Sequence, residues 1–141
     1  PPLGEAIREV LIETPALLAP VLAPEEPAID LYADEVARDL DLLAREAPRL
    51  FARGLPGFGP EEAAPVIAFF TASECPDCAQ AEAELRALSA RLGLRVSRFD
   101  MDRDAALAAR LGLDLAPSYV MRDRLLRGAM PAIVLERYLS P

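Results

Sequence analysis

The two cysteines of the chain, Cys75 and Cys78, are separated only by Pro76 and Asp77. Such a pair can interconvert between two thiols and one disulfide, which is the chemistry of a redox site. The apolar run Val66–Phe70 predicts a buried strand before the pair, and Pro76 suits the first turn of a following helix. The positive end of that helix would lower the pKa of Cys75. We therefore expect Cys75 to be the nucleophile and Cys78 the resolving thiol.

Two other uses of the cysteine pair remain open. A zinc site needs four ligands, usually cysteine and histidine. The chain has no histidine and no further cysteine, so two chains would have to share a four-thiolate site. A purely structural disulfide would close so short a loop that it would remove little entropy from the unfolded chain. A working dithiol is favoured over both, and no metal or other cofactor is expected.

The composition predicts a single soluble domain. The 141 residues are 52% hydrophobic, which is enough to fill one core. No apolar run approaches the roughly 20 residues of a membrane-spanning helix. The net charge of −8 argues against a nucleic-acid partner. The chain begins with Pro1 and Pro2, so we expect a mature or trimmed product.

Alternating strand and helix patterns predict an α/β architecture for residues 61–141. Apolar residues recur at steps of three and four after the cysteine pair, and Gly93 is expected to end that helix. The expected elements that follow are a strand at 94–99, a short helix ending at Gly112, a hairpin with strands at 118–121 and 124–127, and a last helix beginning near Pro131.

Residues 1–60 predict an N-terminal helical extension. Asp30 is a candidate cap for a helix whose apolar stripe continues to Pro48. The segment Thr14–Pro24 is uncharged and apolar, so we expect it to dock on the core or on another chain. The glycine- and proline-rich stretch Gly54–Pro60 predicts a connector into the domain at 61–141.

Several motifs together resemble the thioredoxin-fold oxidoreductase superfamily. They are Cys75-Pro-Asp-Cys78, Phe99-Asp-Met-Asp102, Leu107-Ala-Ala-Arg-Leu-Gly112, Ala116-Pro117-Ser118 and Arg127-Gly128. The resemblance implies a central mixed β-sheet flanked by helices. The ending Ala116–Ala129 also resembles the close of DsbA-type proteins, although the stretch from Cys78 to Pro117 is too short for their helical insertion. The segment Ile7–Leu18 resembles the amino-terminal arm of DsbA-like proteins of the copper-sensitivity suppressor type, which implies a homo-oligomer formed through this arm.

The same resemblance implies the residues of the site. Pro117 would be a cis-proline facing the cysteines, and the backbone of Ala116 would pair with an extended substrate segment. From the residues alone, Pro117 could equally be an ordinary strand-initiating proline. The expected catalytic residues are Cys75 and Cys78, and the expected substrate-binding residues are Pro76, Asp77, Ala116 and Pro117.

Charges around the pair predict the direction of exchange. Glu74 and Asp77 place negative charge near Cys75, which raises its pKa and opposes the effect of the helix end. The chain should therefore act as a reductase or isomerase rather than as a strong oxidant. The strand Val66–Phe70 contains no acid, so Cys78 lacks the buried carboxylate that family members usually place beneath it. Ser73 is a candidate N-cap.

These observations predict a thiol–disulfide oxidoreductase that acts on protein substrates and is reset by a redox partner protein. The resemblance favours a periplasmic or otherwise extracytoplasmic location, with the cytoplasm as the alternative. The alternative function is a redox-inactive binding or assembly module that uses the amino-terminal arm and the groove at Pro117.

Overall fold

The computed structural model describes residues 26–139, and the chain divides into two compact units between Glu35 and Val36. Helix α3 (Glu26–Leu50) crosses this division, and all other described elements belong to the second unit. The helix begins before Asp30 and includes Pro48 in its last turn, so both of its predicted ends are wrong. The predicted arm at 7–18 and the apolar segment at 14–24 lie outside the described residues. None of the helices within residues 26–139 is long and apolar enough to span a membrane.

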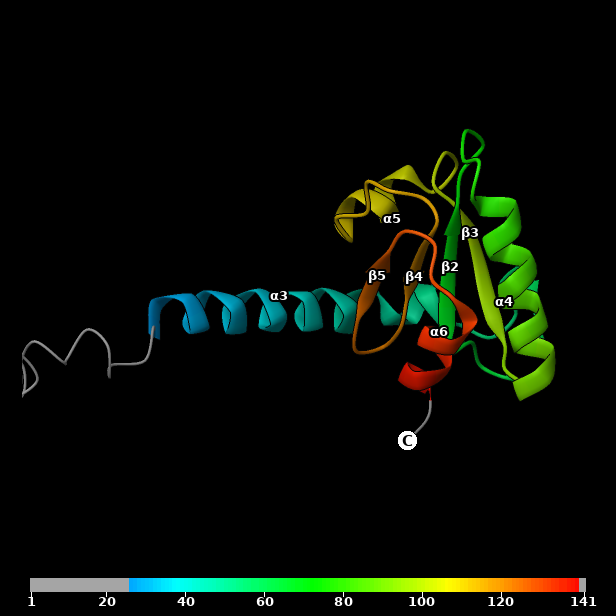
Figure 1. The fold of residues 1–141 in the computed structure, drawn as a ribbon, viewed down its shortest axis with the longest axis horizontal. Helices are drawn as coiled ribbons and strands as arrows, with labels where there is room; N and C mark the ends of the chain where they lie inside the picture. Colours follow the sequence, from blue (N-terminus) through cyan, green and yellow to red (C-terminus); the bar gives the residue numbers. More distant parts are fainter. Residues whose placement is uncertain (1–25, 140–141) are drawn as a thin grey trace, which may run out of the picture. The chain divides into compact units, whose positions relative to one another are not determined.

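The second unit is built on one mixed sheet of five strands in the order β1-β3-β2-β4-β5 (Figure 1). The central pair β2 and β3 is parallel, and the other three pairs are antiparallel. The strands are β1 (Gly57–Phe58), β2 (Ile67–Thr71), β3 (Val96–Asp100), β4 (Ser118–Val120) and β5 (Leu125–Arg127). The predicted hairpin near the end of the chain is therefore confirmed.

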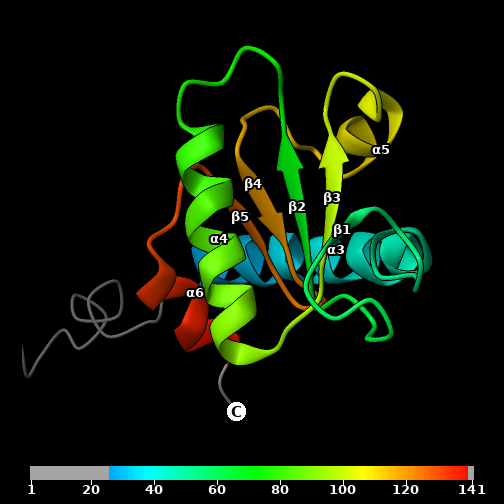
Figure 2. The same ribbon diagram turned by 90° about the vertical axis from the view of Figure 1, so that its right-hand side faces the viewer.

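Side chains of β2 alternate between two apolar clusters, because successive residues of a strand point to opposite faces. Ile67 and Phe69 pack with helices α4 (Cys78–Leu92) and α6 (Ala132–Leu139) on one face. Ala68 and Phe70 pack on the other face, against α5 (Ala105–Arg110) and the part of α3 that lies in this unit. Figure 2 shows α4 and α6 on one side of the sheet. The predicted α/β fold with helices on a mixed sheet is confirmed.

The connector into the sheet contributes to the core of the second unit. Gly57 and Phe58 form the edge strand β1, and Leu43 and Leu50 are completely buried. Arg95 is buried and donates hydrogen bonds to the carbonyl oxygens of Leu55, at 2.8 Å, and Gly59, at 3.1 Å. Residues that the sequence assigned to the extension therefore belong to the sheet and the core, and the boundary expected at residue 60 lies inside the compact unit.

Candidate redox site

Cys75 and Cys78 form a disulfide at the point where the chain passes from β2 to α4, with a Cα–Cα distance of 5.4 Å. Cys78 is the first residue of α4 and is only 4% exposed, whereas Cys75 is partly exposed. The helix therefore begins two residues later than expected. Pro76 and Asp77 form a turn in which the Cys78 amide donates to the Cys75 carbonyl at 3.3 Å. The more accessible sulfur is the one that precedes the helix.

Asp77 occupies the N-cap position of α4, but its side chain makes no capping hydrogen bond. Ser73, the predicted N-cap, lies further from the helix and has a different partner. Its backbone amide and its hydroxyl both donate to the carboxylate atom Oδ2 of Asp102, at 2.9 and 2.8 Å. These two hydrogen bonds, the one from the backbone first, hold the pKa of Asp102 below its usual value.

Pro117 lies immediately before β4, at the end of the sheet where β2 leads into the loop that contains Cys75. The register fixes this placement, because Ser118 pairs with Phe70 near the end of β2. The Ala116–Pro117 peptide bond is cis. Pro117 is buried, and its carbonyl accepts a hydrogen bond of 2.8 Å from the amide of Gly128. Among the turn and loop hydrogen bonds of residues 26–139, none uses the backbone of Ala116.

A cavity of about 280 Å³ opens beside the first two turns of α4. Asp77, Gln80 and Glu84 line it from the helix, and Ala129, Met130 and Pro131 line it from the opposite segment. The amide of Met130 donates to the hydroxyl of Tyr119 at 3.3 Å, which fixes this segment to β4. The cavity combines an apolar wall with carboxylates next to the redox pair.

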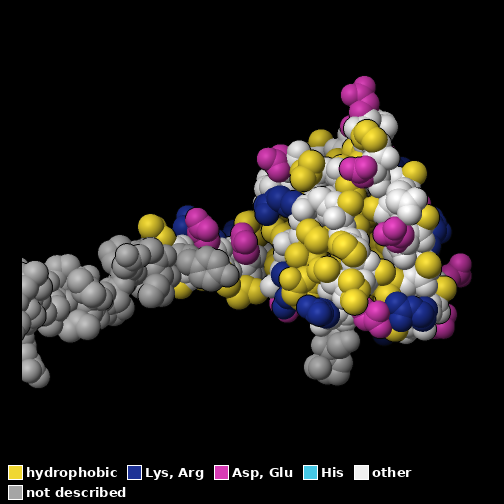
Figure 3. Space-filling view, viewed as in Figure 1, with side chains coloured by type: hydrophobic (Ala, Val, Ile, Leu, Met, Phe, Trp, Pro, Cys, Tyr) yellow, Lys and Arg dark blue, Asp and Glu magenta, His cyan; other side chains and the backbone are white. Residues whose placement is uncertain are grey.

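No acid from the described part of the chain is buried beneath the cysteines. Among the residues whose burial is described, 31 and 33–139, the buried polar ones are one threonine, three serines and one arginine: Thr71, Ser89, Ser97, Ser118 and Arg95. Acidic side chains instead stand at the tip of the loop that leaves β2, at the top of the molecule in Figure 3. Glu74 and Asp77, which lie between β2 and α4, are both exposed.

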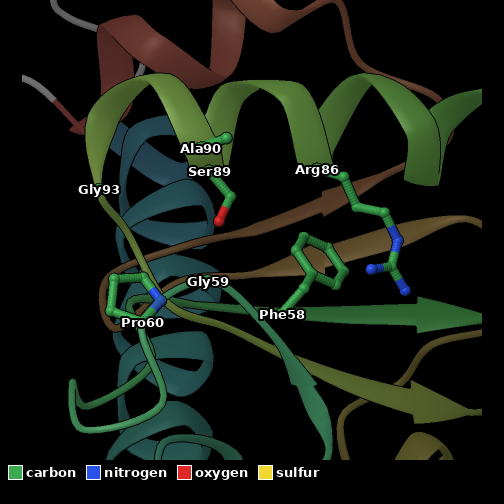
Figure 4. Close-up of a pocket in the computed structure, with 7 residues that line it drawn as sticks. All are labelled: Phe58, Gly59, Pro60, Arg86, Ser89, Ala90 and Gly93. Atoms are coloured by element: carbon green, nitrogen blue, oxygen red, sulfur yellow. The ribbon is translucent and has the colours of Figure 1, made fainter.

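A second cavity, of about 390 Å³, lies along the C-terminal half of α4 (Figure 4). Arg86 lies over the ring of Phe58 at 4.4 Å from its centroid, and the remaining lining residues are small. Neither cysteine lines this cavity. Within residues 26–139, no group of three or more His, Cys, Asp or Glu side chains could hold a metal ion.

The structure brings some predicted site residues together and adds others. Cys75, Pro76 and Asp77 lie between β2 and α4, which begins at Cys78. Ala116 and Pro117 lie at the same end of the sheet. The anchoring role of Asp102 was missed, although the Phe99-Asp-Met-Asp102 motif had marked its position. No local pattern in the sequence marked Gln80, Glu84 and Met130, which line the cavity beside the first turns of α4.

Comparison with known proteins identifies the fold. No protein-family model matches the chain. No curated protein sequence matches it either. Among solved structures, a linker-deletion variant of ScsC from Proteus mirabilis is similar over 96% of this chain and 90% of that chain, with a TM-score of 0.62 and 17% sequence identity. The same protein in a compact conformation is similar over 92% and 98%, with a TM-score of 0.54 and 17% identity. The chain has the thioredoxin fold, in agreement with the family resemblance of its motifs.

Proposed function

We propose that the protein is a thiol–disulfide oxidoreductase that acts on protein substrates through Cys75 and Cys78. The observation that carries the proposal is the unequal burial of the two sulfurs at the end of β2. Cys75 is partly exposed, while Cys78 is buried in the first turn of α4. An incoming disulfide can therefore reach Cys75, and Cys78 is protected until a mixed disulfide has formed.

In the reducing direction, the Cys75 thiolate attacks one sulfur of a substrate disulfide, and the other substrate sulfur leaves as a thiolate. The Cys78 thiolate then attacks the Cys75 sulfur, releases the second substrate thiolate and closes the Cys75–Cys78 disulfide. Two electrons pass from the protein dithiol to the substrate, and a redox partner protein restores the dithiol. The reverse sequence oxidises a substrate.

The groove at Pro117, beside the cysteine pair, supports binding of an extended substrate segment. Pro76 and Asp77 border the sulfurs, and the backbone of Ala116 beside Pro117 is available for strand-like pairing. Because such pairing uses main-chain groups, we expect little sequence specificity from it. Glu74 and Asp77 favour the reductase or isomerase direction, since negative charge near Cys75 disfavours its thiolate.

The test uses single-cysteine variants and a peptide disulfide. Cys78→Ser is expected to accumulate a mixed disulfide with the peptide, because the resolving thiol is absent. Cys75→Ser is the matched control and should trap far less, since its remaining thiol is buried. Wild-type protein should titrate reversibly against glutathione buffers. A pair that does not titrate, or equal trapping by both variants, would overturn the proposal.

The absence of a buried acid favours a second candidate, a thioredoxin-fold binding or assembly module whose cysteines are incidental. Without a proton acceptor beneath Cys78, resolution of the mixed disulfide would be slow. A protein partner that binds equally well after both cysteines are replaced by serine would support this candidate. Loss of catalysed disulfide exchange in the same double variant would support the proposal that the protein is a thiol–disulfide oxidoreductase.

The proposal includes an extracytoplasmic location, because thiols outside the cytoplasm are not kept reduced and a pair such as Cys75 and Cys78 can there cycle through a disulfide. The alternative is the cytoplasm. Cell fractionation of the full chain, combined with trapping of the in vivo thiol state by alkylation, separates the two.

A further inference from the structure

We infer that Asp102 is a positioning residue for Cys75, and that it acts by holding Ser73 in the loop that leads into the cysteine pair. This inference rests on the proposed function and goes beyond it, because it assigns a role outside the motif and outside the substrate groove.

Two hydrogen bonds to one atom connect Ser73 with Asp102, and we call this connection the tie. The amide and the hydroxyl of Ser73 donate to Oδ2 of Asp102 at 2.9 and 2.8 Å. Ser73 is two residues before Cys75, whereas Asp102 belongs to the turn after β3. The carboxylate therefore joins two loops that are 29 residues apart in the sequence.

Hydrogen bonds also hold the turn that contains Asp102. The amide of Asp102 donates to the carboxylate of Asp100 at 2.8 Å, and the amide of Asp104 donates to the Asp100 carbonyl at 2.7 Å. The amide of Met101 donates to the carbonyl of Thr71, the last residue of β2, at 2.8 Å. Asp102 is thus presented from a turn that is fixed to the strand leading into the site.

Cys75 depends on such a tie more than Cys78 does. Cys78 is buried in α4, whose apolar side chains pack on the sheet. Cys75 precedes the helix, and Ser73 and Glu74 before it are exposed, so packing does little to hold this loop. Two sulfurs close a disulfide readily only when both are held near bonding distance. The tie to Asp102 restricts the loop and so raises the effective concentration of the Cys75 thiol at Cys78.

The carboxylate could also act through its charge, and an asparagine separates the two effects. One oxygen of Asp102 accepts both hydrogen bonds, and the amide oxygen of asparagine can do the same without a charge. Asp102→Asn keeps the tie, and Asp102→Ala removes it. Ser73→Ala removes only the hydroxyl donor and keeps the amide.

The experiment measures the equilibrium of the full-length protein with glutathione, together with amide hydrogen exchange of residues 73–75. Asp102→Ala is expected to disfavour the disulfide about fivefold or more and to speed exchange at these amides. Ser73→Ala should have a smaller effect in the same direction. Asp102→Asn should stay within about twofold of wild type. Asp123→Ala is the matched control, because this exposed aspartate lies in the turn between β4 and β5, at the other end of the sheet.

The outcomes separate this inference from the proposed function. A wild-type pair that does not titrate would overturn the function. If wild type titrates, an Asp102→Ala protein with unchanged equilibrium and unchanged amide exchange would overturn the positioning role. An Asp102→Asn effect as large as that of Asp102→Ala would also overturn it, because charge rather than the tie would then be responsible. Should Asp102→Ala fail to fold, Ser73→Ala and Asp102→Asn still decide between these results.

Discussion

The hydroxyl of Ser97, in strand β3, donates a hydrogen bond of 2.6 Å to the carbonyl oxygen of Leu50, the last residue of α3. Both residues are completely buried. The last carbonyls of a helix lack partners within the helix, and in a core they cannot turn to water. Ser97 therefore supplies the partner that allows α3 to end inside the hydrophobic core of the second unit.

Replacing this serine should destabilise the fold. Ser97→Ala leaves the Leu50 carbonyl buried without its short hydrogen bond, and we expect the free energy of unfolding to fall by about 1–3 kcal/mol. Urea denaturation of the oxidised protein measures the change. Ser73→Ala is the comparison. It also removes a serine hydroxyl donor, but its acceptor Asp102 is exposed and can bind water instead, so the free energy of unfolding should change by only about 0.5 kcal/mol. Equal effects of the two variants would contradict the assigned role of Ser97.

The parts of the fold that could be predicted are those with local signals. The apolar run before Cys75 marked β2, Gly93 ended α4 with a left-handed backbone, and the hairpin followed from its polar turn. The order of the cysteines relative to strand and helix came from the same patterns. These features depend on neighbouring residues, so a single sequence is sufficient to show them.

The parts that could not be predicted join distant residues. The hydrogen bond from Ser97 to Leu50 spans 47 residues, and that from Ser73 to Asp102 spans 29. Spacing along the chain contains no information about such pairs until the fold is known. The strand β1 has only two residues, too few for an alternating pattern, and it lies within the glycine- and proline-rich stretch that predicted a connector.

The edge strand β1 should be sensitive to a single methyl group. A Cβ added to Gly57 would overlap the carbonyl oxygen of Val96, a backbone atom that cannot move without disturbing the pairing of β1 with β3. Gly57→Ala is expected to reduce the free energy of unfolding by about 2–3 kcal/mol. Gly93→Ala is the matched comparison. Its Cβ would meet nothing within 4 Å, and only the left-handed backbone (φ 66°) would cost stability, by about 1 kcal/mol. The prediction fails if Gly93→Ala is the more harmful change in urea denaturation.

Tyr119 should limit stability at alkaline pH. Burial raises the pKa of its hydroxyl, the hydrogen bond from the Met130 amide lowers it in part, and the charge of Glu84 raises it again, so the pKa stays above its ordinary value of 10.0. The pKa of Tyr119 is therefore higher in the folded protein than in the unfolded chain. The stability that its protonated hydroxyl contributes is complete below the unfolded-state pKa and is lost as pH rises through the folded-state pKa. The chain has no lysine, so few other groups titrate in this window.

The measurement is the unfolding free energy of the oxidised protein between about pH 8 and 11, a range that brackets the ordinary tyrosine pKa. Wild type is expected to lose stability toward the alkaline end, with phenolate absorbance from Tyr119 appearing last. Tyr119→Phe should remove that part of the pH dependence, and Tyr138→Phe, at an exposed position, should keep it. An identical alkaline profile for wild type and Tyr119→Phe would rule out this assignment.

The charge of Asp77 should set the redox poise of the cysteine pair. Asp77 occupies the N-cap position of α4 without using its side chain for capping, so its replacement removes no hydrogen bond from the helix start. The replacement does remove a negative charge two residues from Cys75. Loss of this charge should stabilise the Cys75 thiolate and therefore the dithiol form. Asp77→His is expected to make the couple more oxidising, by roughly three- to tenfold in its equilibrium constant with glutathione. Asp77→Asn should shift it in the same direction.

The control for Asp77 is Glu61→His, an equal change of charge at an exposed position before β2, at the opposite end of that strand from the cysteines. A local effect of charge requires that this variant leave the equilibrium as it is in wild type. An unchanged equilibrium in Asp77→His would show that the exposed carboxylate is screened by solvent at this distance. In that case the direction of exchange would have to be set by the environment of Cys78, where no acid is buried, rather than by the rim of the site.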